Sequence, residues 1–80
     1  MLTEYIRAAM KKAKYEILPD DKSYYGTIPG FDGVYANARN LEECRKELEE
    51  VLEEWIFFKI SRNLPLPKVG GISLKIKKVV

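Results

Sequence analysis

One amphipathic segment constrains the fold of this 80-residue chain more than any other feature. Between Asn40 and Asn63, apolar residues recur every three or four positions, which is the period of an α-helix packed along one side. The stripe comprises Leu41, Cys44, Leu48, Val51, Leu52 and Trp55, and continues to Phe58 or Lys59. Asn40 and Glu43 have the spacing of a capping box, and prolines beyond Asn63 stop the helix. We therefore expect a main helix over residues 40–63, with one apolar face covering a sheet.

The apolar arc of this helix widens towards its C-terminal end, where apolar residues crowd the sequence between positions 55 and 60. A helix that covers one sheet needs only a stripe, whereas an apolar surface nearly all round indicates burial by a second subunit as well. A short domain without disulfides also gains stability from association. We therefore predict a homo-oligomer, a dimer or a tetramer. Its interface candidates are Trp55, Phe57, Phe58, Leu74 and Ile76.

In residues 14–38 the apolar residues change to a period of two, which is typical of strands. The first strand begins at Lys14 and ends in the turn-forming residues 19–23, and a second strand follows over 24–28. Proline and two glycines in residues 29–33 interrupt that strand before a third over 34–38. Because the connections are short, we expect a three-stranded antiparallel meander.

The two ends complete the predicted topology. Residues 1–13 have helical spacing, with Thr3 as a candidate N-cap, and residues 72–79 alternate between apolar and mostly basic side chains, as a last strand does. The expected order is α-β-β-β-α-β within a single domain over 1–80. This is an α+β fold with an antiparallel sheet and a helix packed on one face.

The composition argues against the common catalytic mechanisms. The chain has no histidine and one cysteine, so disulfides, the usual zinc sites and Ser/His or Cys/His nucleophiles do not arise. Asp20, Asp21 and Asp32 fall in turns, where aspartate is favoured for backbone reasons. We therefore expect no enzyme activity, no metal and no cofactor, and keep a metal-dependent nuclease or hydrolase as the least favoured alternative.

The charges are distributed unevenly along the chain. Residues 40–55 carry seven glutamates, whereas every charged residue from 56 onward is basic. Such blocks are usually solvated faces, but an acidic face also suits a basic protein partner. The N-terminal segment has no uninterrupted apolar run, so we expect neither a signal peptide nor a membrane span, and a cytoplasmic location. An exposed tyrosine in the second strand could also anchor a protein contact.

Residues 25–44, YGTIPGFDGVYANARNLEEC, resemble the signature of the HicB antitoxin family. In that family a strand ends in Ile-Pro, a short loop and a small-residue strand follow, and the helix begins Leu-Glu-Glu and ends near a Pro-x-Pro element. Here Asp32-Gly33 replaces the Pro-Gly pair at the end of the loop, and no C-terminal DNA-binding module follows the last strand, so DNA binding is not expected.

The resemblance implies a partial ribonuclease H-like sheet without the nuclease carboxylates. It also implies a protein partner, a small mRNA-cleaving HicA-like toxin neutralised by direct contact. Our candidates for the toxin contact are Glu49, Glu50, Glu53, Tyr25 and Phe31. The main alternative is an oligomeric interaction domain of the same fold without a toxin partner, and no residue separates these two hypotheses.

Overall fold

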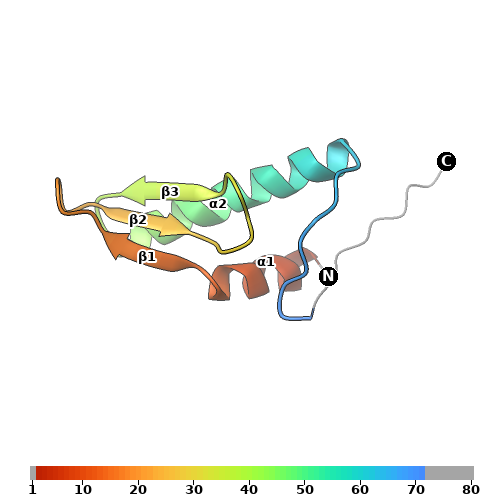
Figure 1. The fold of residues 1–80 in the computed structure, drawn as a ribbon, viewed down its shortest axis with the longest axis horizontal. Coiled ribbons are helices and arrows are strands. Elements are labelled where there is room, and N and C mark those ends of the chain that lie inside the picture. Colours follow the sequence, from red (N-terminus) through yellow and green to blue (C-terminus); the bar gives the residue numbers. More distant parts are fainter. Residues whose placement is uncertain (1, 72–80) are drawn as a thin grey trace.

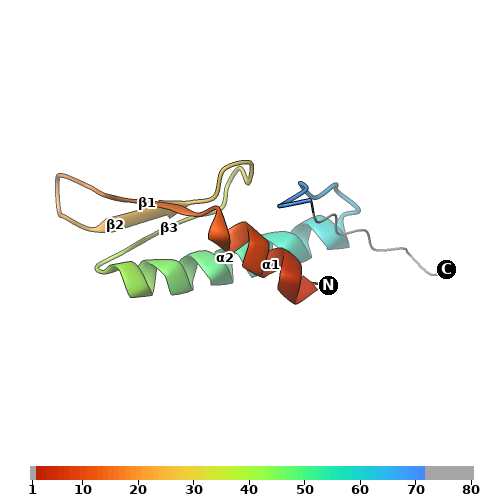
Figure 2. The ribbon, with the colours of Figure 1, turned by 90° about the horizontal axis from the view of Figure 1, so that it is seen from below.

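The computed structural model describes residues 2–71 and places two helices and three strands (Figure 1). They are α1 (Leu2–Lys11), β1 (Lys14–Ile17), β2 (Tyr24–Thr27), β3 (Tyr35–Ala38) and α2 (Leu41–Ser61). The strands form one antiparallel sheet in the order β1-β2-β3, and α2 lies across one face of it with α1 beside α2 (Figure 2). The predicted α+β class and the antiparallel meander are confirmed. The strand expected over 72–79 lies outside the described residues.

Gly26 allows the sheet and α2 to approach closely. It pairs with Tyr15 on β1 and with Ala36 on β3, so these three residues share the face that α2 covers. A Cβ atom at position 26 would lie 3.0 Å from the Tyr15 ring and 3.2 Å from Cys44 Sγ. The absence of a side chain at Gly26 therefore makes room for the helix.

An asparagine lies at each end of α2. Asn40 Oδ1 accepts a hydrogen bond of 2.8 Å from the Glu43 backbone N–H, which satisfies one of the free amides of the first turn. At the other end Asn63 adopts a left-handed conformation with φ of 55°. The N–H of Leu64 then donates to the Lys59 carbonyl and that of Asn63 to the Ile60 carbonyl, which is the Schellman pattern.

The N-cap expected at Thr3 is wrong. The first helix already includes Leu2, so Thr3 lies within its first turn and is exposed. A single hydroxyl residue ahead of a weakly apolar segment does not specify a helix start, because serine and threonine are also tolerated within helices.

The core is built on one row of α2, namely Cys44, Leu48, Leu52 and Ile56, all at most 1% exposed. The row follows a spacing of four residues, so it continues to Ile56 and not to Phe58, which lies about 200° further round the helix. Leu41, at the first helical position, is 46% exposed instead of buried. The sheet, the loop before β3, α1 and the segment after α2 supply the rest of the core: Tyr5, Ala9, Ile28, Phe31, Val34, Ala36 and Val69.

One hydrogen bond joins distant parts of the chain. The Tyr5 hydroxyl on α1 donates to the Pro67 carbonyl, in the segment that follows α2. Tyr5 is fully buried, and desolvation raises the pKa of its hydroxyl above the usual value. The bond therefore stays formed across the neutral pH range and holds the segment after α2 against α1 (Figure 1).

Candidate protein-binding surfaces

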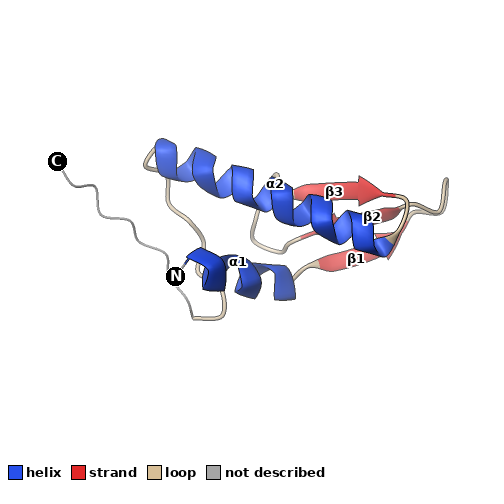
Figure 3. Ribbon diagram, turned by 180° about the vertical axis from the view of Figure 1, so that it is seen from behind, coloured by secondary structure: helices blue, strands red, loops and turns tan. Residues whose placement is uncertain are grey.

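The outward side of α2 carries a row of exposed glutamates, which we call the acidic stripe: Glu43, Glu47, Glu50 and Glu54. Glu50 is two residues from both Leu48 and Leu52, and two residues correspond to about 200° of helix rotation. It therefore points away from the buried row. Spacings of four, three and four residues place the other members on the same side. Figure 3 shows that this helix forms the outer layer of the molecule over the sheet.

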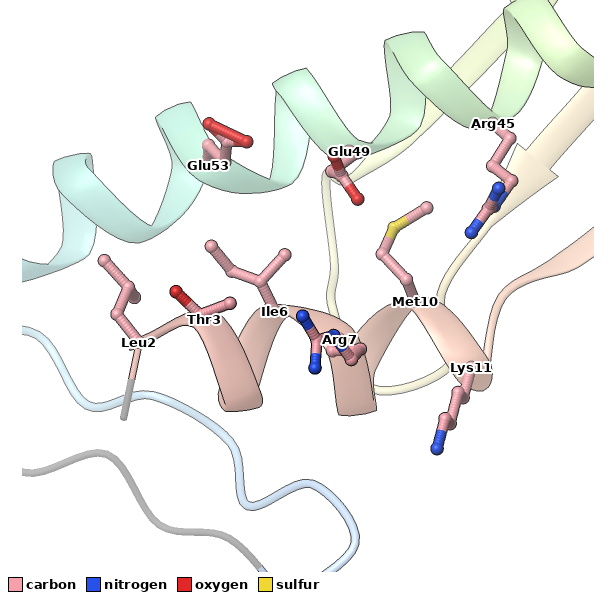
Figure 4. A pocket seen from close by; sticks show the side chains of 9 residues that line it. All are labelled: Leu2, Thr3, Ile6, Arg7, Met10, Lys11, Arg45, Glu49 and Glu53. Atoms are coloured by element: carbon pink, nitrogen blue, oxygen red, sulfur yellow. The ribbon is translucent and has the colours of Figure 1, made fainter.

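Glu49 and Glu53 belong to a different surface. They face a groove of about 710 Å³ between α1 and α2, which we call the α1–α2 groove (Figure 4). Its lining consists of Leu2, Thr3, Ile6, Arg7, Met10, Lys11, Arg45, Glu49 and Glu53. The three glutamates predicted as one toxin contact are thus divided between two sides of α2, with Glu50 in the acidic stripe.

Tyr25 lies on the face of the sheet that points away from α2. It is half-buried, and its ring pairs with that of Tyr35 at a centroid distance of 6.1 Å. Tyr35 is 57% exposed, so this outer sheet face presents aromatic surface to solvent. Because α2 covers the other face, Tyr25 and the acidic stripe cannot belong to one flat contact.

Phe31 is not a surface residue, which corrects the prediction that it contacts a partner. It is 4% exposed, and its ring packs between Tyr5 at 6.2 Å and Trp55 at 5.2 Å. The turn after β2, closed by a hydrogen bond from the Phe31 N–H to the Ile28 carbonyl, folds the ring onto the two helices. A loop between glycines resembles an exposed loop in sequence, but here it closes the core.

The C-terminal end of α2 presents an exposed apolar cluster, which we call the aromatic end. It consists of Phe57, Phe58 and Leu64, at 62%, 49% and 41% exposed. The Arg62 guanidinium lies 4.7 Å from the Phe58 ring and covers part of it. Leu64 is not among the interface residues predicted from the sequence, although its place directly after the helix and before Pro65 was a usable signal.

Trp55 differs from the two phenylalanines. Its ring is half-buried against Phe31, and Lys59 Nζ lies 4.9 Å above it. Trp55 therefore packs mainly within its own chain. Leu74 and Ile76, the other interface candidates, lie outside the described residues.

Two groups singled out in the sequence, the Cys44 thiol and the Asp21 carboxylate, have local packing and hydrogen-bonding roles. Cys44 is fully buried, and burial raises the pKa of its thiol, which keeps it protonated and unreactive. The Asp21 carboxylate accepts hydrogen bonds from the hydroxyl and the N–H of Ser23, which lower its pKa and fix the turn between β1 and β2. Within residues 2–71, no three His, Cys, Asp or Glu side chains gather as metal ligands would. No helix of that range has the length and apolar content needed to cross a bilayer.

These features define a class of protein, a small two-layer α+β domain with an open antiparallel sheet. Within residues 2–71, most of its exposed carboxylates lie along α2, and its exposed aromatic side chains lie on the outer sheet face and at the C-terminal end of α2. Residues 4–67 match the model of the UPF0150-like family, and the chain belongs to this family.

Two relatives show the extent of the likeness. A UPF0150 protein of Thermotoga maritima is 46% identical over 35 residues, a stretch that spans 44% of this chain and 47% of that protein. The crystal structure of TTHA0281 from Thermus thermophilus superposes with a TM-score of 0.89. It is 38% identical in sequence, and the match covers 96% of this chain and 95% of that one.

Proposed function

We propose that this UPF0150-like chain is a non-catalytic, HicB-like antitoxin-type domain, which binds a small mRNA-cleaving toxin of the HicA-like class. The observation that carries the proposal is the acidic stripe, a row of four exposed carboxylates on the outer layer of the molecule. The resemblance of residues 25–44 to the HicB signature names the class of partner. Such a partner acts on mRNA, so the place of action is the cytoplasm.

The acidic stripe and an RNA-binding toxin are expected to carry opposite charges. A protein that binds RNA must present positive charge, because the phosphate backbone dominates its affinity. The acidic stripe is complementary to such a surface, and complementary charge speeds association and selects partners. By covering the basic surface, the domain would exclude RNA from the toxin without any chemistry of its own.

The experiment that tests this function is an RNA-cleavage assay with a purified toxin of the HicA-like class. We expect cleavage to fall in proportion to the added chain and to stop near one binding equivalent. The chain alone should leave the RNA intact. Full cleavage in the presence of excess chain would contradict the proposal, and cleavage by the chain itself would favour the nuclease alternative.

A second candidate function is that of an oligomeric interaction domain without a toxin, and the aromatic end supports it. Two adjacent exposed phenylalanines on a helix form the kind of apolar patch that marks a subunit contact. Self-association is compatible with both candidates, because the aromatic end and the middle of the acidic stripe are different parts of α2.

For self-association, we expect sedimentation at micromolar concentration to give a dimer or a tetramer. The double change Phe57→Ser and Phe58→Ser should shift the chain to a monomer, because it removes the exposed apolar surface. The matched control is Tyr35→Ser, which removes an exposed aromatic ring from the outer sheet face and should leave the mass unchanged. A wild-type chain that sediments only as a monomer would refute the prediction.

A further inference from the structure

The charges that line the α1–α2 groove are sorted along its length. Glu53 lies at the end where α1 begins (Figure 4). Arg45 and Lys11 lie at the opposite end, and Arg7 and Glu49 lie between the two. The groove therefore has an acidic end and a basic end. Neither a uniformly basic ligand nor a uniformly acidic one would match both ends.

The α1 wall of the groove is apolar and lies between these charges. The half-buried side chains of Leu2, Ile6 and Met10 point towards α2 (Figure 4). They are four residues apart, so the row advances about 6 Å per side chain along the helix. Because Ile6 is the middle member, the row presents apolar side chains at the same intervals from either end.

A second copy of the chain, turned about a two-fold axis, carries the same pattern in reverse order. In a two-fold contact the same surface of both copies meets, so a residue at one end lies against a residue from the other end. With the axis at the middle of the groove, Arg45 lies opposite Glu53 of the partner subunit. Arg7 lies opposite Glu49 of the partner subunit in the same way. The sorted charges are thus complementary to themselves, with Ile6 at the centre of the apolar contact.

We propose that the α1–α2 groove is a second self-association surface, which takes the groove of another copy in antiparallel orientation. The residues of the aromatic end do not line the groove, so both contacts can form on one chain. Two different two-fold contacts with perpendicular axes close as a tetramer. The inference rests on self-association through the aromatic end, and it selects the tetramer from the two states expected for this chain.

A single groove contact is weak. The ten residues of α1 are about 15 Å long, and exposed ion pairs such as those at the rim contribute little. One contact therefore does not hold two monomers together at micromolar concentration. Two dimers joined through their aromatic ends meet through two grooves at once, and the second contact forms at a high effective concentration within the complex.

Charge reversal in the groove tests this contact by sedimentation. The variant Lys11→Glu with Arg45→Glu makes both ends acidic, and the variant Glu49→Lys with Glu53→Lys leaves only basic charges in the lining. At micromolar concentration we expect a tetramer for the wild type and a dimer for each variant, because like charges then meet across the contact. The four side chains are exposed, so the fold should tolerate the changes.

An equimolar mixture of the two variants should return to the tetramer, because an acidic groove then meets a basic one. This recovery also shows that both variants are folded. The matched control, Lys12→Glu with Lys46→Glu, makes the same change in net charge as the first variant at the next residue of each segment. Both lysines are exposed and lie outside the groove lining, so this control should remain a tetramer.

Three results would overturn the groove contact. They are a wild-type chain that stops at a dimer, a groove variant that remains a tetramer, and a mixture that stays dimeric. A wild-type monomer would overturn the groove contact and the aromatic-end contact together. The toxin takes no part in these measurements, so failure of the groove contact would leave the proposed antitoxin function standing.

Discussion

The Leu52→Ala variant is expected to lose about 2–5 kcal/mol of unfolding free energy. Leu52 is fully buried in the middle of the row that α2 contributes to the core. Truncation removes its contacts and leaves a cavity that a helix packed on a rigid sheet cannot close. Because small domains have roughly 5–15 kcal/mol of total stability, this loss should leave part of the chain unfolded at physiological temperature.

Leu41→Ala is the matched control for this experiment. It makes the same chemical change on the same helix, at a residue that is 46% exposed. Its cost should stay within about 0.5 kcal/mol, as for most surface substitutions. Urea denaturation of both variants measures the difference, and equal losses at the two positions would show that the buried row is assigned incorrectly.

The sequence determined most of the fold because local signals agreed with one another. Asn40 has the capping spacing and caps α2, and Asn63 adopts the left-handed conformation that ends it. The prolines and glycines around residues 29–33 interrupt the sheet where expected, with Gly30 and Gly33 at positive φ. Such turn and cap signals act over a few residues, so they can be identified without tertiary information.

The candidate site was predicted less well, because it depends on contacts between distant segments. Phe31 is buried because α1 and α2 both reach it, and no local pattern specifies that. Glu49 and Glu50 are neighbours in sequence, yet they face different surfaces because α1 packs along one side of α2. A helical wheel places them about 100° apart, but it assigns each to a surface only when the direction of the sheet and the position of the first helix are both known.

The largest functional effect is expected from reversing the charge of the acidic stripe. The triple variant Glu47→Lys, Glu50→Lys and Glu54→Lys should associate with a HicA-like toxin about 10- to 100-fold more slowly at low salt, because electrostatic steering sets the rate of encounter. These three side chains are exposed, so the fold should tolerate the changes.

A second triple variant controls for total charge. Glu4→Lys, Glu16→Lys and Asp32→Lys make the same change in net charge at exposed residues outside α2. If long-range net charge alone mattered, both variants would slow association equally. We expect the control to retain most of the wild-type rate, because screening limits the reach of each charge to roughly 10 Å at moderate salt.

The role of the acidic stripe in binding is therefore tested by stopped-flow association of the toxin with the wild-type chain and both triple variants at several salt concentrations. We expect an association rate that falls steeply with salt for the wild type and the control. For the stripe variant we expect a slow rate that no longer falls as salt is added. Equal rates and equal salt dependence for all three chains would contradict the assignment of the acidic stripe as the surface that meets the partner.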